Sequence, residues 1–223
     1  INDYGLYNVV GGIVIMFSFL SSTMSAASQR FFSFELGKND LLQFKKTFGL
    51  MVVIYGCIAI LVLILAETIG LWFLNYKMII PPDRLVAANW VFQFSILSFL
   101  VTIMTIPYNA AIIAHENMKV YAYVSIVEVV LKLIFVFVLV GVLFDKLILY
   151  SILVFITTCI TTFLYSFICR KNYPECKFQF YWNRPLFNTL ISYSGWNLFG
   201  ATAAVLNNQG VNIMLNLFFG PVI

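Results

Sequence analysis

Charge is scarce in this chain of 223 residues, and five long stretches have none at all. A sixth stretch, residues 120–144, is apolar except for Glu128 and Lys132. Only 10% of the residues are charged while 62% are hydrophobic, so too few polar groups remain to cover a water-soluble domain of this length. The composition therefore excludes a soluble fold. The five uncharged stretches are residues 4–29, 47–66, 85–115, 147–169 and 185–223.

Histidine and cysteine are also scarce, which limits the chemistry open to the chain. His115 is the only histidine, so a Ser-His-Asp triad or a histidine metal cluster would have to be completed from outside this sequence. Beside Glu116, His115 is better explained as the end of a helix. The cysteine spacing matches no zinc pattern. We predict no catalytic residue, no metal site and four free thiols. These thiols are Cys57, Cys159, Cys169 and Cys176.

The uncharged stretches have the length of membrane spans. A hydrocarbon core about 30 Å thick is crossed by roughly 20 helical residues, and a backbone inside lipid must satisfy its own hydrogen bonds. The sequence therefore predicts an all-α integral membrane protein, a polytopic bundle of six transmembrane helices. Because the sequence begins at Ile1 and stops within an apolar run, we expect an internal fragment of a longer protein.

The basic residues predict the orientation of the bundle. Lys and Arg collect in cytoplasmic loops, and here nine fall on one side of the predicted membrane and three on the other. We place the first side in the cytoplasm. Because the basic residues are explained by this orientation, we expect no nucleic-acid partner. The nine are Arg30, Lys38, Lys45, Lys46, Lys119, Arg170, Lys171, Lys177 and Arg184, and the three are Lys77, Arg84 and Lys146.

Two cytoplasmic connections carry apolar residues next to these charges. In residues 35–48, leucines and phenylalanines stand beside three lysines, which fits either a short interfacial amphipathic helix or a solvated loop that packs on the bundle. In residues 170–184, five aromatic side chains predict an anchor at headgroup depth. The five are Tyr173, Phe178, Phe180, Tyr181 and Trp182.

Polar side chains inside the spans are the candidate functional residues. Glu128 and Lys132 are four residues apart on one helix face, and Lys132 falls near the predicted middle of the membrane. Charge at that depth is costly unless it faces protein or water, so such residues commonly mark ion or substrate pathways. The alternative is a structural ion pair that joins two helices.

Carboxamides and helix-bending residues fill similar stripes in two other spans. Asn109 continues a stripe of hydroxyl residues beside Pro107, which removes a backbone hydrogen bond and favours a kink. Asn197, Asn208 and Asn212 share the last span with Gly200 and Gly210. For each stripe alone, helix packing through small polar residues is the simpler explanation. Together with the midspan charges, the stripes favour a hydrated cavity, in which Arg30 and Lys132 suit an anionic headgroup such as a phosphate.

Three blocks of the sequence resemble the bacterial polysaccharide-unit flippases, which move lipid-linked oligosaccharides such as O-antigen units. These flippases belong to the multidrug, oligosaccharidyl-lipid and polysaccharide exporter superfamily. The blocks are YGLYNVVGGIVIMFSFLSSTMSAASQRFFSFELGK at residues 4–38, IPYNAAIIAHENM at 106–118 and SYSGWNLFGATAAVLNNQGVNIMLNLFFGPV at 192–222.

The resemblance implies a transporter of twelve to fourteen helices in two lobes. Residues 1–184 would belong to the N-terminal lobe, and residues 185–223 would begin the C-terminal lobe as the seventh helix of the full protein. It implies a multi-pass protein of the bacterial cytoplasmic (inner) membrane that flips undecaprenyl-pyrophosphate-linked oligosaccharide by alternating access, for lipopolysaccharide or other surface polysaccharide biosynthesis. Expected partners are this lipid-linked oligosaccharide, membrane lipids, and a polysaccharide polymerase with its export machinery. No cofactor is expected beyond a coupling proton or sodium ion.

The same resemblance suggests roles for the candidate residues. Arg30 and Lys132 would attract pyrophosphate, Glu128 would balance Lys132 or respond to a proton, and the asparagines would contact sugar hydroxyls. Pro107, Gly200 and Gly210 are candidate hinges. Two alternatives stay open: a cation-coupled multidrug exporter of the same superfamily, and an intramembrane glycan-modifying transferase built around His115 and Glu116.

Overall fold

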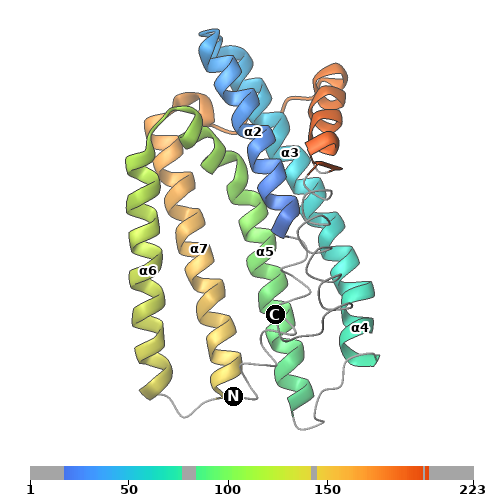
Figure 1. Cartoon of the computed structure of the whole chain (residues 1–223), viewed down its shortest axis with the longest axis vertical. Helices are drawn as coiled ribbons and strands as arrows, with labels where there is room; N and C mark the ends of the chain where they lie inside the picture. Colours follow the sequence, from blue (N-terminus) through green and yellow to red (C-terminus); the bar gives the residue numbers. More distant parts are fainter. Residues whose placement is uncertain (1–17, 77–83, 142–144, 198, 201–223) are drawn as a thin grey trace, which may run out of the picture.

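A computed structural model of the chain describes residues 18–76, 84–141, 145–197 and 199–200, and this part is helical, without strands (Figure 1). The prediction of an all-α protein is confirmed. The elements in chain order are α2 (Ser18–Gly37), α3 (Leu41–Leu65), the π-helical turn η1 (Ala66–Gly70), α4 (Leu71–Tyr76), α5 (Leu85–Ala114), α6 (Met118–Gly141), α7 (Lys146–Asn172) and the 3₁₀ turn η3 (Pro174–Cys176). A further helix occupies residues 184–197.

Four helical segments of the described part are long and apolar enough to cross a membrane. Their most apolar windows have mean hydropathies between 1.9 and 2.9. The first joins α3, η1 and α4 into one rod. These spans match four of the six predicted ones, and the other two fall partly outside the described residues. The four segments are Leu41–Tyr76, Leu85–Ala114, Met118–Leu139 and Lys146–Asn172.

The helix α5 lies at the centre of the bundle. It contacts α2, α3, α6 and α7, and its side chains Val91, Phe92 and Ile112 are fully buried. In Figure 1, α6 lies at the opposite edge of the bundle from α3 and the 184–197 helix. Most of the side chains along α6 are exposed, which in a membrane means that they face lipid or other helices.

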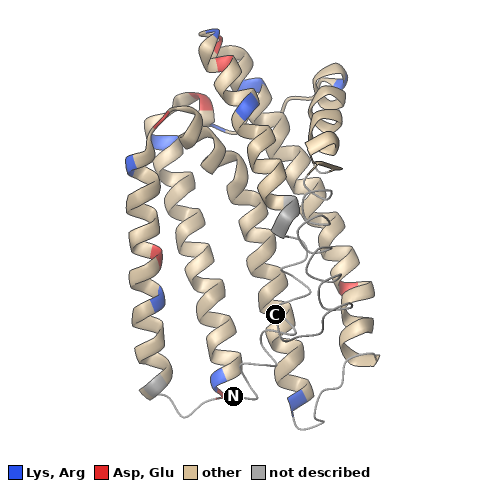
Figure 2. Cartoon of the chain, viewed as in Figure 1, with Lys and Arg blue, Asp and Glu red and all other residues tan. Residues whose placement is uncertain are grey.

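Charges gather at the two ends of the bundle, as Figure 2 shows, and the only charges midway along α6 are Glu128 and Lys132. The end that holds the α2–α3 connection, the α5–α6 connection and η3 carries most of the basic residues. At the other end Arg84 forms an ion pair of 2.8 Å with Asp145, which ties the start of α5 to the start of α7. Charged ends and an apolar middle are typical of a membrane protein. Which end is cytoplasmic stays a prediction.

The connection predicted over residues 35–48 is much shorter in the structure. Helix α2 continues to Gly37, and α3 begins at Leu41 because the Asp40 carboxylate accepts a hydrogen bond from the Gln43 amide at 2.9 Å. The phenylalanines are therefore part of α3, where Phe44 packs on Phe32 of α2 with ring centroids 4.8 Å apart. Residues 41–48 are neither a separate interfacial helix nor a loop, since the cap extends α3 by two turns, but Phe44 and Phe48 do pack on the bundle as the second alternative expected.

Candidate functional site

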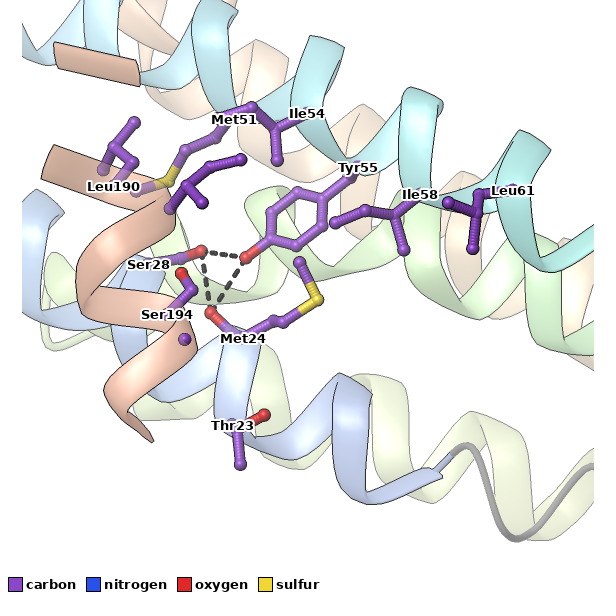
Figure 3. Close-up of a pocket in the computed structure, with 12 residues that line it drawn as sticks. Thr23, Met24, Ser28, Met51, Ile54, Tyr55, Ile58, Leu61, Leu190 and Ser194 are labelled. Carbon is purple, nitrogen blue, oxygen red and sulfur yellow. Dashed lines mark hydrogen bonds between the residues drawn. The ribbon is translucent and has the colours of Figure 1, made fainter. Parts of the chain in front are cut away.

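A cavity of about 270 Å³ lies between α2, α3 and the 184–197 helix (Figure 3). Its walls are mainly apolar, with hydroxyl groups from Thr23, Ser28, Tyr55 and Ser194. Its volume is close to the lower end of the range for small-molecule pockets, about 300 Å³. The lining residues are Thr23, Met24, Ser28, Met51, Ile54, Tyr55, Ile58, Leu61, Leu190, Ile191, Ser194 and Gly195.

A small hydrogen-bonded group fixes the polar part of this wall. The Tyr55 hydroxyl donates to the Met24 carbonyl at 2.8 Å, and the Ser28 hydroxyl lies 3.0 Å from the same oxygen. The two hydroxyls also contact each other, as the dashed lines in Figure 3 show. Because Ser28 and Tyr55 are buried and bonded, they hold α2 against α3. The remainder of the cavity wall is mainly apolar, so it can contact a ligand there through apolar side chains.

A cation lies on one of the helices that form the cavity, but it is not among the lining residues. Arg30 follows Ser28 by two residues on α2 and donates a hydrogen bond of 2.8 Å to the hydroxyl of Tyr193, the residue before the cavity-lining Ser194. The guanidinium also lies over the Tyr193 ring, 4.6 Å from its centroid. Asn197, one turn further along the helix, lies near the same hydroxyl. Arg30 is exposed, so its remaining N–H groups can meet an anion.

The structure therefore brings two of the predicted residues, Arg30 and Asn197, together through Tyr193. Sequence reasoning missed Tyr193, although it lies within the block that resembles the flippases. The signal available was an aromatic residue four positions before Asn197, which shares its helix face. Ser28 was interpreted only as a packing serine of α2, and its packing role is what the contact with Tyr55 supports.

Glu128 and Lys132 pair with each other and do not line this cavity. The Lys132 Nζ lies 2.6 Å from Oε1 of Glu128, and the two side chains are 57% and 40% exposed. Lys132 borders a gap of about 90 Å³ between α6 and α7. Tyr165 of α7 lies near Glu128 and Ser125, so part of the polar stripe of α6 faces α7. Within the described residues the pair is separate from Arg30, and a shared cavity stays a prediction.

Asn109 and Pro107 lie in the buried part of α5. Oδ1 of Asn109 is buried and has no hydrogen-bond partner among the described residues. The helix runs through Pro107 unbroken, although the proline removes one backbone donor. One turn earlier, the hydroxyl of Thr105 lies 2.6 Å from that of Thr162, so the polar stripes of α5 and α7 face each other.

The remaining predicted residues belong to the last span. Asn208, Asn212 and Gly210 lie outside the described residues. Gly200 is helical and exposed at the end of the described part. Its role as a hinge stays a prediction.

His115 ends α5, as predicted, but its partner is Glu175 rather than Glu116. His115 is the C-terminal cap of the helix, and its Nε2 lies 2.8 Å from Oε1 of Glu175 in η3. The ring stacks on Tyr173 with a centroid separation of 3.8 Å. Glu116 is exposed and adopts a positive φ of 58°. The contact joins two chain segments 60 residues apart, so sequence spacing gave no signal for it.

The four cysteines are free, as predicted. Cys169 and Cys176 are buried side by side at the end of α7, and the hydrogen bond between them, together with burial, raises the pKa of the Cys176 thiol. In the ranges covered by the structure, no group of three or more His, Cys, Asp or Glu side chains could hold a metal ion.

No family model, curated protein or solved structure matches this chain. The resemblance to the flippases is thus neither supported nor opposed by these comparisons, and the function is argued from the site itself.

Proposed function

We propose that the chain is part of a flippase that carries undecaprenyl-pyrophosphate-linked oligosaccharide units across the bacterial cytoplasmic membrane by alternating access. The observation that carries this proposal is Arg30, held by Tyr193 of the 184–197 helix, which forms one wall of an apolar cavity. An exposed cation beside an apolar hollow matches an amphiphile whose headgroup is anionic.

Arg30 is suited to a phosphate because its guanidinium presents several donors in a fixed plane. One N–H already bonds to Tyr193, and stacking on the ring fixes the orientation of the guanidinium. This arrangement pre-orders the cation, so less conformational entropy is lost when the phosphate binds. Asn197, near the same hydroxyl, is placed to contact a neighbouring phosphate or sugar oxygen.

The apolar walls serve the lipid tail. Met51, Ile54, Ile58 and Leu61 lie along one side of α3 and line the cavity. An isoprenoid segment fits such a wall, because the wall is as apolar as the bilayer interior that the tail leaves. The headgroup then crosses because protein donors replace its hydration, and no covalent bond changes.

Transport requires the two lobes to move relative to each other. Pro107 within α5 and Gly200 in the last helix are the candidate pivots. Glu128 and Lys132 provide a second charged position on α6, either for a coupling proton or for cargo at another stage of the cycle. In this proposal the chain belongs to a two-lobed transporter of twelve to fourteen helices in the inner membrane.

The test is flipping in proteoliposomes that carry a fluorescent undecaprenyl-pyrophosphate oligosaccharide. The protein should expose inner-leaflet label to a membrane-impermeant quencher faster than protein-free vesicles do. Transport of organic cations without flipping would instead favour the multidrug exporter. Chemical change of the glycan in detergent, where no leaflets exist, would favour the transferase.

A further inference from the structure

An extended segment of residues 177–183, the strap, connects η3 to the 184–197 helix and crosses α3. The backbone of Gln179 packs directly on Gly49 of α3, where a Cβ atom would overlap the Gln179 carbonyl oxygen. Further along, Lys46 Nζ lies over the Tyr181 ring, 5.4 Å from its centroid. These two contacts fix the strap against the first turns of α3.

The end of the strap is also fixed. Asn183 donates from Nδ2 to the Tyr181 hydroxyl at 3.2 Å, and its Oδ1 accepts from the Leu186 amide, which caps the following helix. The Trp182 ring lies 4.8 Å from that of Phe187 in the same helix. The strap is therefore a structured element with a defined inner side.

Its outer side is aromatic and exposed. Phe178, Phe180 and Trp182 are 49%, 70% and 53% exposed, while Tyr181 and Asn183 between and beside them are half-buried. Three large aromatic side chains on one exposed surface would be costly in water, because apolar area is left unburied. They need an environment that is partly apolar and partly polar.

The position of the strap supplies that environment. It crosses α3 between Lys46, the last charged residue of the helix start, and Gly49, within the uncharged run 47–66. This is where the charged end of the bundle meets its apolar middle. In a membrane protein that level is the headgroup region, where aromatic side chains concentrate.

The charges around the strap have one sign. Lys177 begins the strap and Arg184 follows it, both are exposed, and Lys46 of α3 lies over the Tyr181 ring. The nearest acidic residue along the chain, Glu175, is already bonded to His115. An exposed aromatic surface with three cations in or next to it is complementary to anionic lipid.

We propose that the strap is a binding site for anionic phospholipid headgroups, with Phe178, Phe180 and Trp182 inserted at the interface and Lys46 and Arg184 binding the lipid phosphates. The site is distinct from the cavity beside Arg30 and does not depend on the transported substrate. The proposal gives the aromatic side chains of the strap a specific partner, the negatively charged leaflet of the membrane.

The first test measures the depth of the Trp182 side chain in nanodiscs of phosphatidylcholine with or without phosphatidylglycerol. The protein keeps Trp182 as its only tryptophan, the others being replaced by phenylalanine. Lipids brominated near the headgroup should quench Trp182 strongly, and lipids brominated at the chain end should quench it weakly. Quenching by aqueous iodide alone, or equally by both lipids, would overturn the proposal.

The second test counts the phosphatidylglycerol retained by the purified protein. Lys46→Gln and Arg184→Gln should each weaken lipid binding about fivefold, the effect expected for one cation near an anionic surface. Lys119→Gln and Lys171→Gln are matched controls, because both lysines are exposed at the same end but lie outside the strap. Equal losses in the two pairs of variants would contradict a site at the strap.

Discussion

The Nε2 atom of His115 lies 2.8 Å from Oε1 of Glu175, so the end of α5 is tied to the turn that follows α7. On the other side of the ring, Nδ1 lies 2.8 Å from the Ala111 carbonyl oxygen, which can only accept. Nδ1 therefore donates to the carbonyl, and Nε2 faces the carboxylate. Both side chains are largely buried, at 14% and 12% exposure.

Removing the carboxylate should destabilise this end of the bundle. Glu175→Ala leaves a buried imidazole donor without its partner, and breaking a buried pair in this way costs about 3 kcal/mol. Glu175→Gln keeps an acceptor and should cost less. The free energy of unfolding in mixed micelles, followed by circular dichroism, measures both. Glu116→Gln, at an exposed position, is the control, and an equal loss there would show that the contact contributes nothing.

The thiols of Cys169 and Cys176 should resist alkylation in the folded protein. Both are fully buried, and the hydrogen bond between them and burial raise the pKa of Cys176, so little thiolate forms at neutral pH. Maleimide labelling followed by mass spectrometry should modify them only after denaturation. A cysteine introduced at the exposed neighbour, Lys177→Cys, should react at once. Rapid labelling of Cys176 in folded protein would show that η3 is open.

Glu35, at the charged end of α2, should make stability depend on pH. Burial, followed by the nearby Asp40, raises the pKa of Glu35 above its usual value of 4.5. Its contribution to stability is therefore present below that value and is lost as pH rises through the folded-state pKa. Glu35→Gln should raise the free energy of unfolding at pH 7 and leave it unchanged at pH 4. A loss at both pH values would mean that the carboxylate makes a stabilising contact.

The hydroxyl of Tyr55 should matter for the stability of the cavity wall. Tyr55→Phe removes the hydrogen bond to the Met24 carbonyl but leaves the Ser28 hydroxyl on the same oxygen. The expected loss in the free energy of unfolding is about 1 kcal/mol. Tyr55→Ala also removes the buried ring and should cost about 3 to 5 kcal/mol. Equal losses in the two variants would assign the stabilisation to the hydroxyl alone.

The helices were predictable because hydrophobic length alone determines a membrane span. Three of the four described spans follow uncharged runs, the fourth follows the apolar run that holds Glu128 and Lys132, and the long run 85–115 corresponds closely to α5. The start of α3 was not predicted, since the Asp40 cap is a local signal that the lysine-rich pattern obscured. Caps decide where helices begin, whereas composition decides only that they exist.

The site was predictable only in part. Arg30 and Asn197 were identified from charge and polarity. Tyr193, which lies near both, was not identified, because it is 163 residues from Arg30 in the sequence. Glu128 and Lys132 were expected to pair, and they do, yet helix spacing does not define which neighbour they face. Periodicity predicts which side chains share a face and not what that face meets.

The most direct test of the proposed function is the initial flipping rate of Arg30→Ala against Arg170→Ala. Arg170 is the matched control because it also donates to a tyrosine hydroxyl, Tyr108, at 2.8 Å, but lies on α7, which contributes no residue to the cavity wall. Losing one charged hydrogen bond to the phosphate should lower the rate on the order of tenfold to hundredfold in Arg30→Ala. Arg170→Ala should flip at the parent rate. Equal rates in the two variants would contradict a headgroup site at Arg30.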